Sequence, residues 1–212
     1  MKKLEPEIKC EIATYLMTVK VLCPELTSSE LTYIKSGLTV LHLKSKEFFI
    51  HSGSIQNEIG FVSHGLLRVY CVDNNDREIT VKFIKENEFA VHFSAFIAQN
   101  PCLYNIKSIE PSSIVKISFE HIQEGYKRFT NMERYGRLIA EEVCKIQEKR
   151  IESFLFNNGE ERYLKFINEN SDLFNRVSQT DLSTYLGISR QSLTRLRKKH
   201  LKNTDIGKFN NK

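Results

Sequence analysis

The sequence predicts an α+β fold: N-terminal helices, an antiparallel β-roll or jelly-roll barrel, a long helix and a C-terminal winged helix-turn-helix. Two observations lead to this prediction. The spacing of apolar residues changes from helical to a period of two and back again, and two capped short helices lie near the end. With 212 residues, 41% hydrophobic and 27% charged, the chain can form one large domain or two small ones.

The first part of the chain is predicted to be helices followed by short strands. Residues 4–36 have helical spacing, interrupted by Pro24, and Thr27 or Ser28 is placed to cap a second helix. From about 38 to 120 the period is two, and turns separate the apolar runs. Such short antiparallel strands are typical of a barrel or jelly roll, which often holds a small ligand. We therefore expect a sensor domain over 1–120, with its β-roll at about 38–120.

A long apolar stripe follows Phe119 at helical spacing. Its members are Ile122, Tyr126, Phe129, Met132, Tyr135, Leu138, Ile139, Val143, Ile146 and Ile151. A long helix with a narrow stripe is typical of a dimer seam, but the stripe could also pack on the chain's own barrel. Both roles can hold, with one face for each. We assign 121–157 to this dimerisation helix and its linker.

Residues 177–199 have the pattern of two short helices joined by a tight turn. Ser178 and Ser189 are placed to cap them, and Gly187 lies where the first helix must end in the left-handed region. Apolar residues recur at helical spacing, namely Leu182, Tyr185, Leu186, Leu193 and Leu196. This is the plan of a helix-turn-helix, whose second helix enters the major groove of DNA. We assign 158–212 to a winged helix-turn-helix domain.

The charge distribution supports a nucleic-acid partner. Residues 176–202 contain seven Lys and Arg side chains against one acid, Asp181. Residues 145–212 have a net charge of +6, whereas residues 1–144 have −1. A cationic segment suits a polyanion, although basic side chains at a helix end also complement the helix dipole. The dipole alone does not explain the capped first helix and the early Arg190 together.

Other features bear on where the protein works. Acidic residues among the first apolar ones argue against a signal peptide, and no apolar run approaches the roughly 18 residues that span a membrane. The five cysteines are odd in number and scattered, which favours reduced thiols. We therefore expect a cytoplasmic protein without a membrane partner.

The order of these elements resembles the Crp–Fnr family of bacterial transcription regulators over nearly the whole chain. The most specific matching segments are 161–164, 177–179 and 186–195, and a weaker match includes Gly53 and 65–68. The resemblance implies a homodimer on double-stranded DNA that reads a near-palindromic operator through residues 189–199. RNA polymerase is then a candidate partner.

The resemblance also places the residues that would contact DNA. Arg190, Gln191 and Arg195 match the base-reading positions, since Arg suits guanine and Gln suits adenine. The family often has Glu in place of Gln191, so the operator sequence stays open. Six further side chains are expected to contact phosphates, which position without specifying: Ser178, Thr180, Ser192, Thr194, Arg197 and Lys198.

The sensor half departs from the family pattern. Members that bind cyclic AMP have a Gly-Glu pair and an Arg-Ser or Arg-Thr pair, which here correspond to 91–92 and 102–103, Val-His and Cys-Leu. A buried phosphate without its Arg would be costly, so cyclic AMP is disfavoured. An iron–sulfur cluster is disfavoured too, because no third cysteine lies near Cys10 and Cys23. An unidentified effector, or none, remains. Candidate pocket residues, which could equally be packing and surface residues, are His92, Phe93, Tyr104, Arg137 and Glu141.

Two other functions were weighed. A β-roll can be a metal-dependent cupin enzyme, and His42, His51, His64 and His92 lie in this one. Cupin sites need a closely spaced His pair followed by an acid, which these spacings do not supply. No nucleophile set or phosphate loop is apparent, so the sequence does not favour an enzyme. A ligand-binding module that no longer binds DNA is the third possibility, and the basic recognition helix argues against it.

Overall fold

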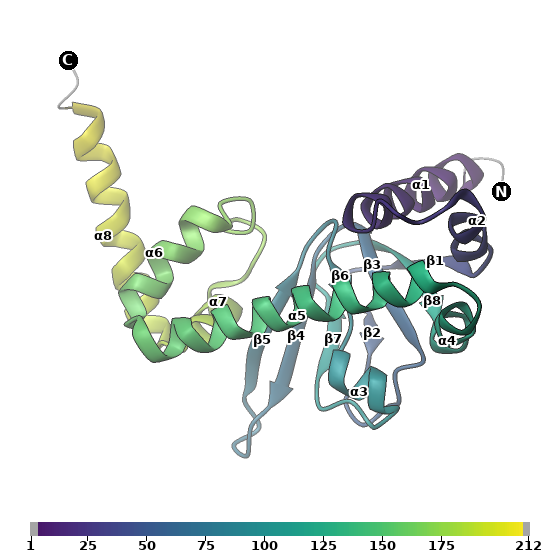
Figure 1. Ribbon diagram of the computed structural model, residues 1–212. Coiled ribbons are helices and arrows are strands. Elements are labelled where there is room, and N and C mark those ends of the chain that lie inside the picture. The colour runs from purple at the N-terminus through teal and green to yellow at the C-terminus, as the bar shows by residue number, and fades with distance from the viewer. Residues whose placement is uncertain (1–3, 210–212) are drawn as a thin grey trace. The chain divides into compact units, whose positions relative to one another are not determined.

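The computed structural model describes residues 4–209, with side chains over 8–200, and the ends of the predicted domains, 1–3 and 210–212, lie outside this range. The first elements are α1 (Leu4–Leu22), α2 (Ser28–Ser36), β1 (Leu38–Leu43), β2 (Phe48–Ile50), β3 (Glu58–His64), β4 (Leu67–Val72) and β5 (Glu78–Ile84) (Figure 1). Then follow β6 (Phe89–Ala90), α3 (Phe93–Ala98), β7 (Asn105–Ser108), β8 (Ser112–Ser118) and α4 (Phe119–Arg128). The chain ends in α5 (Thr130–Phe156), α6 (Gly159–Glu169), α7 (Gln179–Leu186) and α8 (Arg190–Phe209).

These elements form two compact units. The first contains the chain up to Cys71 and residues 81–147, and the second contains residues 72–80 and the chain from Glu148 onward. None of the helices in the described range is long and apolar enough to cross a bilayer. The α+β class predicted from the sequence is confirmed.

The two N-terminal helices are separated where Pro24 was expected to interrupt them. Thr27 is the N-cap of α2, and its backbone N–H donates to the Glu30 carboxylate at 2.7 Å while its hydroxyl accepts from the Glu30 backbone N–H at 3.3 Å. This reciprocal capping box satisfies two backbone donors at the helix start. Asn131 also donates its side-chain amide to the Glu30 carboxylate, at 3.1 Å. The carboxylate therefore ties α2 to the start of α5.

Glu30 predicts a pH dependence of stability. Burial raises its pKa, but hydrogen bonds from Thr27 and Asn131 outweigh burial, and the net pKa is lowered. A lowered folded-state pKa stabilises the fold above the unfolded-state value near 4.3, and this contribution is lost as pH falls through the folded-state pKa. We expect the free energy of unfolding to fall below about pH 4. Glu30→Gln should flatten that decline in urea titrations at several pH values, whereas Glu120→Gln, an exposed change, should not. Equal declines in wild type and Glu30→Gln would contradict this assignment.

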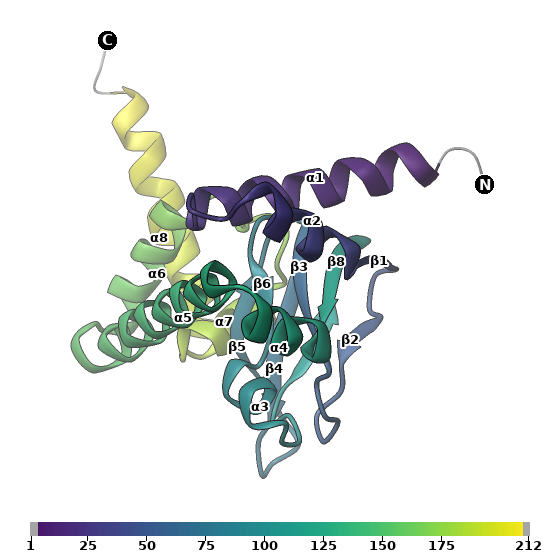
Figure 2. The same cartoon turned by 45° about the vertical axis from the view of Figure 1, so that its right-hand side comes forward.

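The strands form two four-stranded sheets, with orders β1-β8-β3-β6 and β2-β7-β4-β5. Every pairing described for them is antiparallel. Figure 2 shows α1 and α2 beside the β1-β8-β3 sheet. The predicted β-roll is thus present, and its strands alternate with the turns expected at Gly53 and 73–76.

Two apolar clusters fill the first unit. One joins α1, α2, α4 and α5 to the β1-β8-β3-β6 sheet, with Phe61, Val115 and Met132 among its buried members. The other lies within the roll, and its eleven buried residues are Leu43, Ile50, Val62, Leu67, Val69, Ile84, Ala90, Ala95, Cys102, Ile106 and Ile114. Burial at this scale drives folding, at about 25 cal/mol per Å² of apolar surface. The interior of the roll is therefore packed with its own side chains.

The predicted single helix after Phe119 is two helices, which corrects the sequence prediction. α4 ends at Arg128, the C-cap Phe129 has an extended backbone at φ −138° and ψ 116°, and α5 begins at Thr130. The apolar stripe runs across this break because Ile122 in α4 and Met132 in α5 are buried in the same cluster. Thr130 and Glu133 have the Thr-x-x-Glu spacing of a capping box, which is the local signal for the second start.

The wing of the predicted winged helix-turn-helix is also corrected. Between residues 157 and 209 the structure contains α6, α7 and α8 and no strand. The segment 170–177 forms turns instead of a hairpin, and its buried residues Leu173 and Val177 anchor it. α8 continues to Phe209, past the predicted end at 199, since no helix-stopping residue intervenes before Gly207.

Candidate nucleic-acid interface and sensor core

α7 is held at both ends by local hydrogen bonds. The Ser178 hydroxyl accepts from the Asp181 backbone N–H at 3.0 Å and donates to the Asp181 carboxylate at 2.7 Å. At the other end Gly187 has φ +64°, its N–H donates to the Thr184 carbonyl, and the Ile188 N–H donates to the Ser183 carbonyl. These last two bonds make a Schellman motif, which needs a left-handed residue. The predicted caps and turn glycine are confirmed.

α8 begins two residues after this turn. The Ser189 hydroxyl accepts from the Ser192 backbone N–H at 3.1 Å, as expected of an N-cap. Leu193 is fully buried in the same unit as Leu182 and Leu186. Three predicted base-reading side chains are exposed: Arg190, Gln191 and Arg195. The local fold therefore buries one face of α8 and leaves these three side chains exposed to solvent.

The predicted phosphate contacts have mixed environments. Thr180 and Lys198 are exposed, and Ser192 is half-buried beside the Ser189 cap. The Thr194 hydroxyl donates to the Arg190 carbonyl at 3.0 Å. The guanidinium of Arg197 lies 4.2 Å from the centre of the Phe174 ring, a cation–π distance. Arg197 and Ser178 therefore already have structural partners, whereas Lys198 is an exposed cation.

Two arginines that sequence reasoning did not assign support this interface. Arg162 donates to the Leu186 carbonyl at 2.9 Å and to the Asn157 carbonyl at 2.5 Å. Arg150 donates to the Tyr185 carbonyl, and burial lowers its pKa. Both guanidinium groups stack on Phe154, at 4.4 Å for Arg150 and 4.6 Å for Arg162. They bind the orphan carbonyls at the C-terminal end of α7, where positive charge is favoured.

The five candidate pocket residues do not form one site. His92 and Tyr104 lie together, with ring centroids 4.5 Å apart, and burial lowers the pKa of His92. Phe93 packs against the first apolar cluster. Arg137 and Glu141 form an exposed ion pair with each other along α5. None of the five lines either of the cavities described next.

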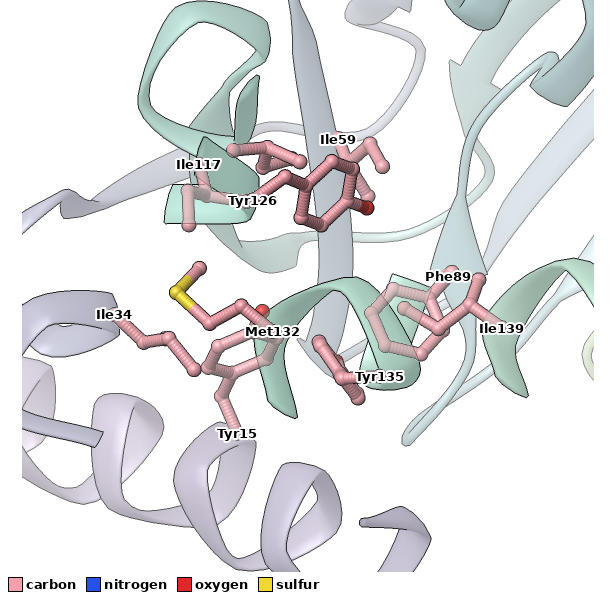
Figure 3. Close-up of a pocket in the computed structure, with 10 residues that line it drawn as sticks. Tyr15, Ile34, Ile59, Phe89, Ile117, Tyr126, Met132, Tyr135 and Ile139 are labelled. Atoms are coloured by element: carbon pink, nitrogen blue, oxygen red, sulfur yellow. The ribbon is translucent and has the colours of Figure 1, made fainter. Parts of the chain in front are cut away.

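An apolar cavity of about 30 Å³ lies between α1, α2, α4, α5 and the sheet (Figure 3). Its lining includes Tyr15, Tyr126 and Tyr135, and burial raises the pKa of Tyr15 to about 12. A cavity of this size holds a water molecule and not a nucleotide. A second, polar cleft of about 440 Å³ lies under α1.

Side chains that could ligate a metal ion are scattered over the described residues. No three His, Cys, Asp or Glu side chains there gather closely enough to hold a metal ion. The five cysteines are free thiols. His42, His51, His64 and His92 therefore do not form the closely spaced set that a cupin site requires.

The sequence and the fold are similar to those of known proteins. Residues 40–129 match the cyclic nucleotide-binding domain family. The regulator CLP of Xanthomonas campestris, described as responsive to c-di-GMP, is 16% identical with a TM-score of 0.67, over 84% of this chain and 93% of that one. FixK2 of Bradyrhizobium japonicum is 15% identical with a TM-score of 0.68, over 78% and 86%. A Crp–Fnr family regulator of Eubacterium rectale is 17% identical with a TM-score of 0.64, over 84% and 86%.

No curated protein sequence matches the chain. At these low identities the solved structures establish the fold, and the resemblance predicted from the sequence is confirmed at that level. Residues 40–129 thus match the cyclic nucleotide-binding domain family, and the chain has the fold of the solved structures of Crp–Fnr regulators.

Proposed function

We propose that this protein is a DNA-binding transcription regulator of the Crp–Fnr type that binds a near-palindromic operator as a homodimer. The observation that supports it most is the α7–turn–α8 geometry, with Gly187 at φ +64° and Arg190, Gln191 and Arg195 exposed on the first turns of α8. An α-helix presented in this way fits the major groove, and its first residues reach base edges. Such a regulator works in the cytoplasm, and RNA polymerase is its expected partner.

Dimerisation is supported by apolar side chains that the single chain leaves uncovered. On α5, Ile151 is 59% exposed and Leu155 71%, and their spacing of four residues places them on one face of the helix. Large apolar side chains clustered on one exposed helix mark an interaction surface. A second copy would cover them as a helical seam and present two α8 helices to DNA. The buried Met132, Tyr135 and Ile139 meanwhile pack on the chain's own sheet, which is the other role that the sequence left open for the stripe.

The test is selection of bound sequences from a random DNA pool at physiological salt. A two-fold symmetric motif with half-sites about 34 Å apart, one helical turn, is the expected result. An enriched motif without symmetry would contradict the dimeric mode. DNA binding itself is refuted if no DNA sequence is enriched either by the protein alone or by the protein with the small-molecule fraction of a cell extract added.

The base-reading role of α8 gives a separable prediction. Arg195→Ala should weaken binding to the selected operator by about 1–3 kcal/mol and relax the preference at one base pair. Lys198→Ala, which removes an exposed cation from the same helix, should weaken binding to all sequences alike and reduce the salt dependence. Mobility shifts with operator and single-base variants measure both. If Arg195→Ala weakens binding to every sequence equally, Arg195 contacts phosphate.

The packed interior of the roll bears on the effector. Eleven buried apolar residues fill it, and the positions that correspond to the family's phosphate-binding pair are Cys102, 2% exposed, and Leu103. A cyclic phosphate would meet no guanidinium there, which supports a sensor that does not use cyclic AMP.

A further inference from the structure

An open cleft of about 440 Å³, lined by polar residue types, lies on the outer face of the first unit, away from the apolar interior of the roll. Its lining comes from α1 and from three strands of one sheet, and consists of Cys10, Glu11, Thr14, His42, Ser63, His64 and Ser113. A cleft of this volume is within the range of about 300–1,000 Å³ that small-molecule sites occupy.

The strand register builds the floor of this cleft. Ser113 on β8 faces His42 on β1 and also faces His64 on β3, so the three residues form one row across the sheet. The pairing of β3 shifts between Val62 and His64, where Ser63 is the extra residue. Such a bulge re-aims side chains, and here both Ser63 and His64 line the cleft.

Hydrogen bonds within the floor leave defined groups for a ligand. His42 Nδ1 lies 2.9 Å from the Ser113 hydroxyl, and the Ser63 hydroxyl donates to the Ser113 carbonyl at 3.0 Å. These bonds fix the row and leave His42 Nε2 and the His64 ring without a described partner. Histidine ring nitrogens can donate or accept, depending on the tautomer.

Glu11 on α1 supplies the charge. Its Oε2 atom is buried and has no hydrogen-bond partner among the described residues. A carboxylate oxygen excluded from water without a donor is destabilising. The cleft lining contains this carboxylate and no Lys or Arg. A ligand that brings a positive charge would be attracted to the Glu11 carboxylate in the cleft lining, whereas an anion would be repelled.

We propose that this cleft is a binding site for a small organic amine, whose ammonium group pairs with Glu11 and whose remaining polar atoms contact the His42–Ser113–His64 row. A bare metal ion fits less well, because the described side chains do not gather as a ligand set. The proposal concerns the first unit alone and is independent of whether the protein binds DNA.

The test is titration of the full-length protein with putrescine and with agmatine, followed by amide NMR spectra and calorimetry. A diol of putrescine's length and succinate are the uncharged and anionic controls. Shifts are expected at the amides of the cleft, with no response to either control compound. Glu11→Gln keeps the side-chain shape and should weaken binding at least about tenfold. Glu148→Gln, at an exposed acid on α5, should leave the affinity unchanged.

Three results would overturn the proposal. The first is an absence of chemical-shift changes in the cleft at amine concentrations up to about 10 mM. The second is equal amine affinity of the wild type and Glu11→Gln. The third is a set of cleft shifts that Zn²⁺ causes and the amines do not. Should Glu11→Gln fail to fold, as its own spectrum would show, His64→Ala removes an exposed partner at a strand end. This second variant should bind the amine severalfold more weakly than the wild type, and succinate should still cause no shifts.

Discussion

Leu193→Ala should destabilise the helix-turn-helix unit by about 2–5 kcal/mol, the largest effect that we expect of any single substitution. Leu193 is fully buried, on the one face of α8 that turns away from Arg190, Gln191 and Arg195. Truncation removes transfer free energy and leaves a cavity in a unit whose other fully buried side chains include Leu182, Leu186 and Tyr163. A small unit has few other contacts with which to offset such a loss.

Urea unfolding followed by far-ultraviolet circular dichroism measures this change, since the chain contains no tryptophan to report by fluorescence. Gln191→Ala is the matched control, because Gln191 is exposed on the same helix and its stability effect should stay within about 0.5 kcal/mol. The two variants should differ in the opposite sense in DNA binding. Gln191→Ala should change the base preference while the protein stays folded. If Leu193→Ala lowers the free energy of unfolding by less than about 1 kcal/mol, Leu193 is not buried as described.

The elements that the sequence predicts well are those whose signals are local. Thr27, Ser178 and Ser189 are capping side chains in the structure, and Gly187 has the left-handed φ that its place before Ile188 implied. Each of these signals is confined to a few neighbouring residues, so no knowledge of distant contacts was needed. The period of two across 38–120 likewise predicted the roll, although β3 and β4 each bury four successive residues.

The prediction errors arise where the spacing of apolar residues indicates which residues are buried but does not indicate whether the helix is continuous. The stripe from Ile122 to Ile151 crosses a break at Phe129, because residues on both sides of the break contribute to the same cluster. The wing was part of the assignment of 158–212, and no alternation of apolar residues after Leu173 supported it. In both cases the local residues, Thr130 with Glu133 and the turn-forming 170–177, were better guides than the wider analogy.

Sites assembled from distant segments were out of reach of sequence reasoning. The cleft brings Glu11 beside His64 and Ser113, and a spacing of about a hundred residues has no local signature. The same holds for Arg150 and Arg162, to which the sequence assigned no role. Their function becomes visible only when the carbonyls of Tyr185 and Leu186 are placed against them.

Arg162→Met should destabilise the same unit by about 2–4 kcal/mol, since hydrogen bonds from a charged donor contribute about 1.5–3 kcal/mol each. The substitution keeps an apolar stem for the Phe154 ring but leaves the carbonyls of Leu186 and Asn157 without their guanidinium donor. Arg162→Lys should recover less than half of the loss, because an ammonium group cannot reproduce the planar fork that reaches both carbonyls. Urea unfolding of the three proteins gives the two differences.

The position of these carbonyls allows a structural effect of Arg162→Met on DNA binding to be distinguished from the loss of a direct DNA contact. The Leu186 carbonyl ends α7 immediately before Gly187, so loss of its donor loosens the turn that sets the angle of α8. Arg162→Met should therefore weaken binding to every operator variant by the same factor, in contrast to Arg195→Ala. Lys165→Met, an exposed change on the same helix, should alter neither stability nor binding. If Arg162→Met weakens DNA binding while unfolding is unchanged, Arg162 contacts phosphate directly and the turn does not depend on it.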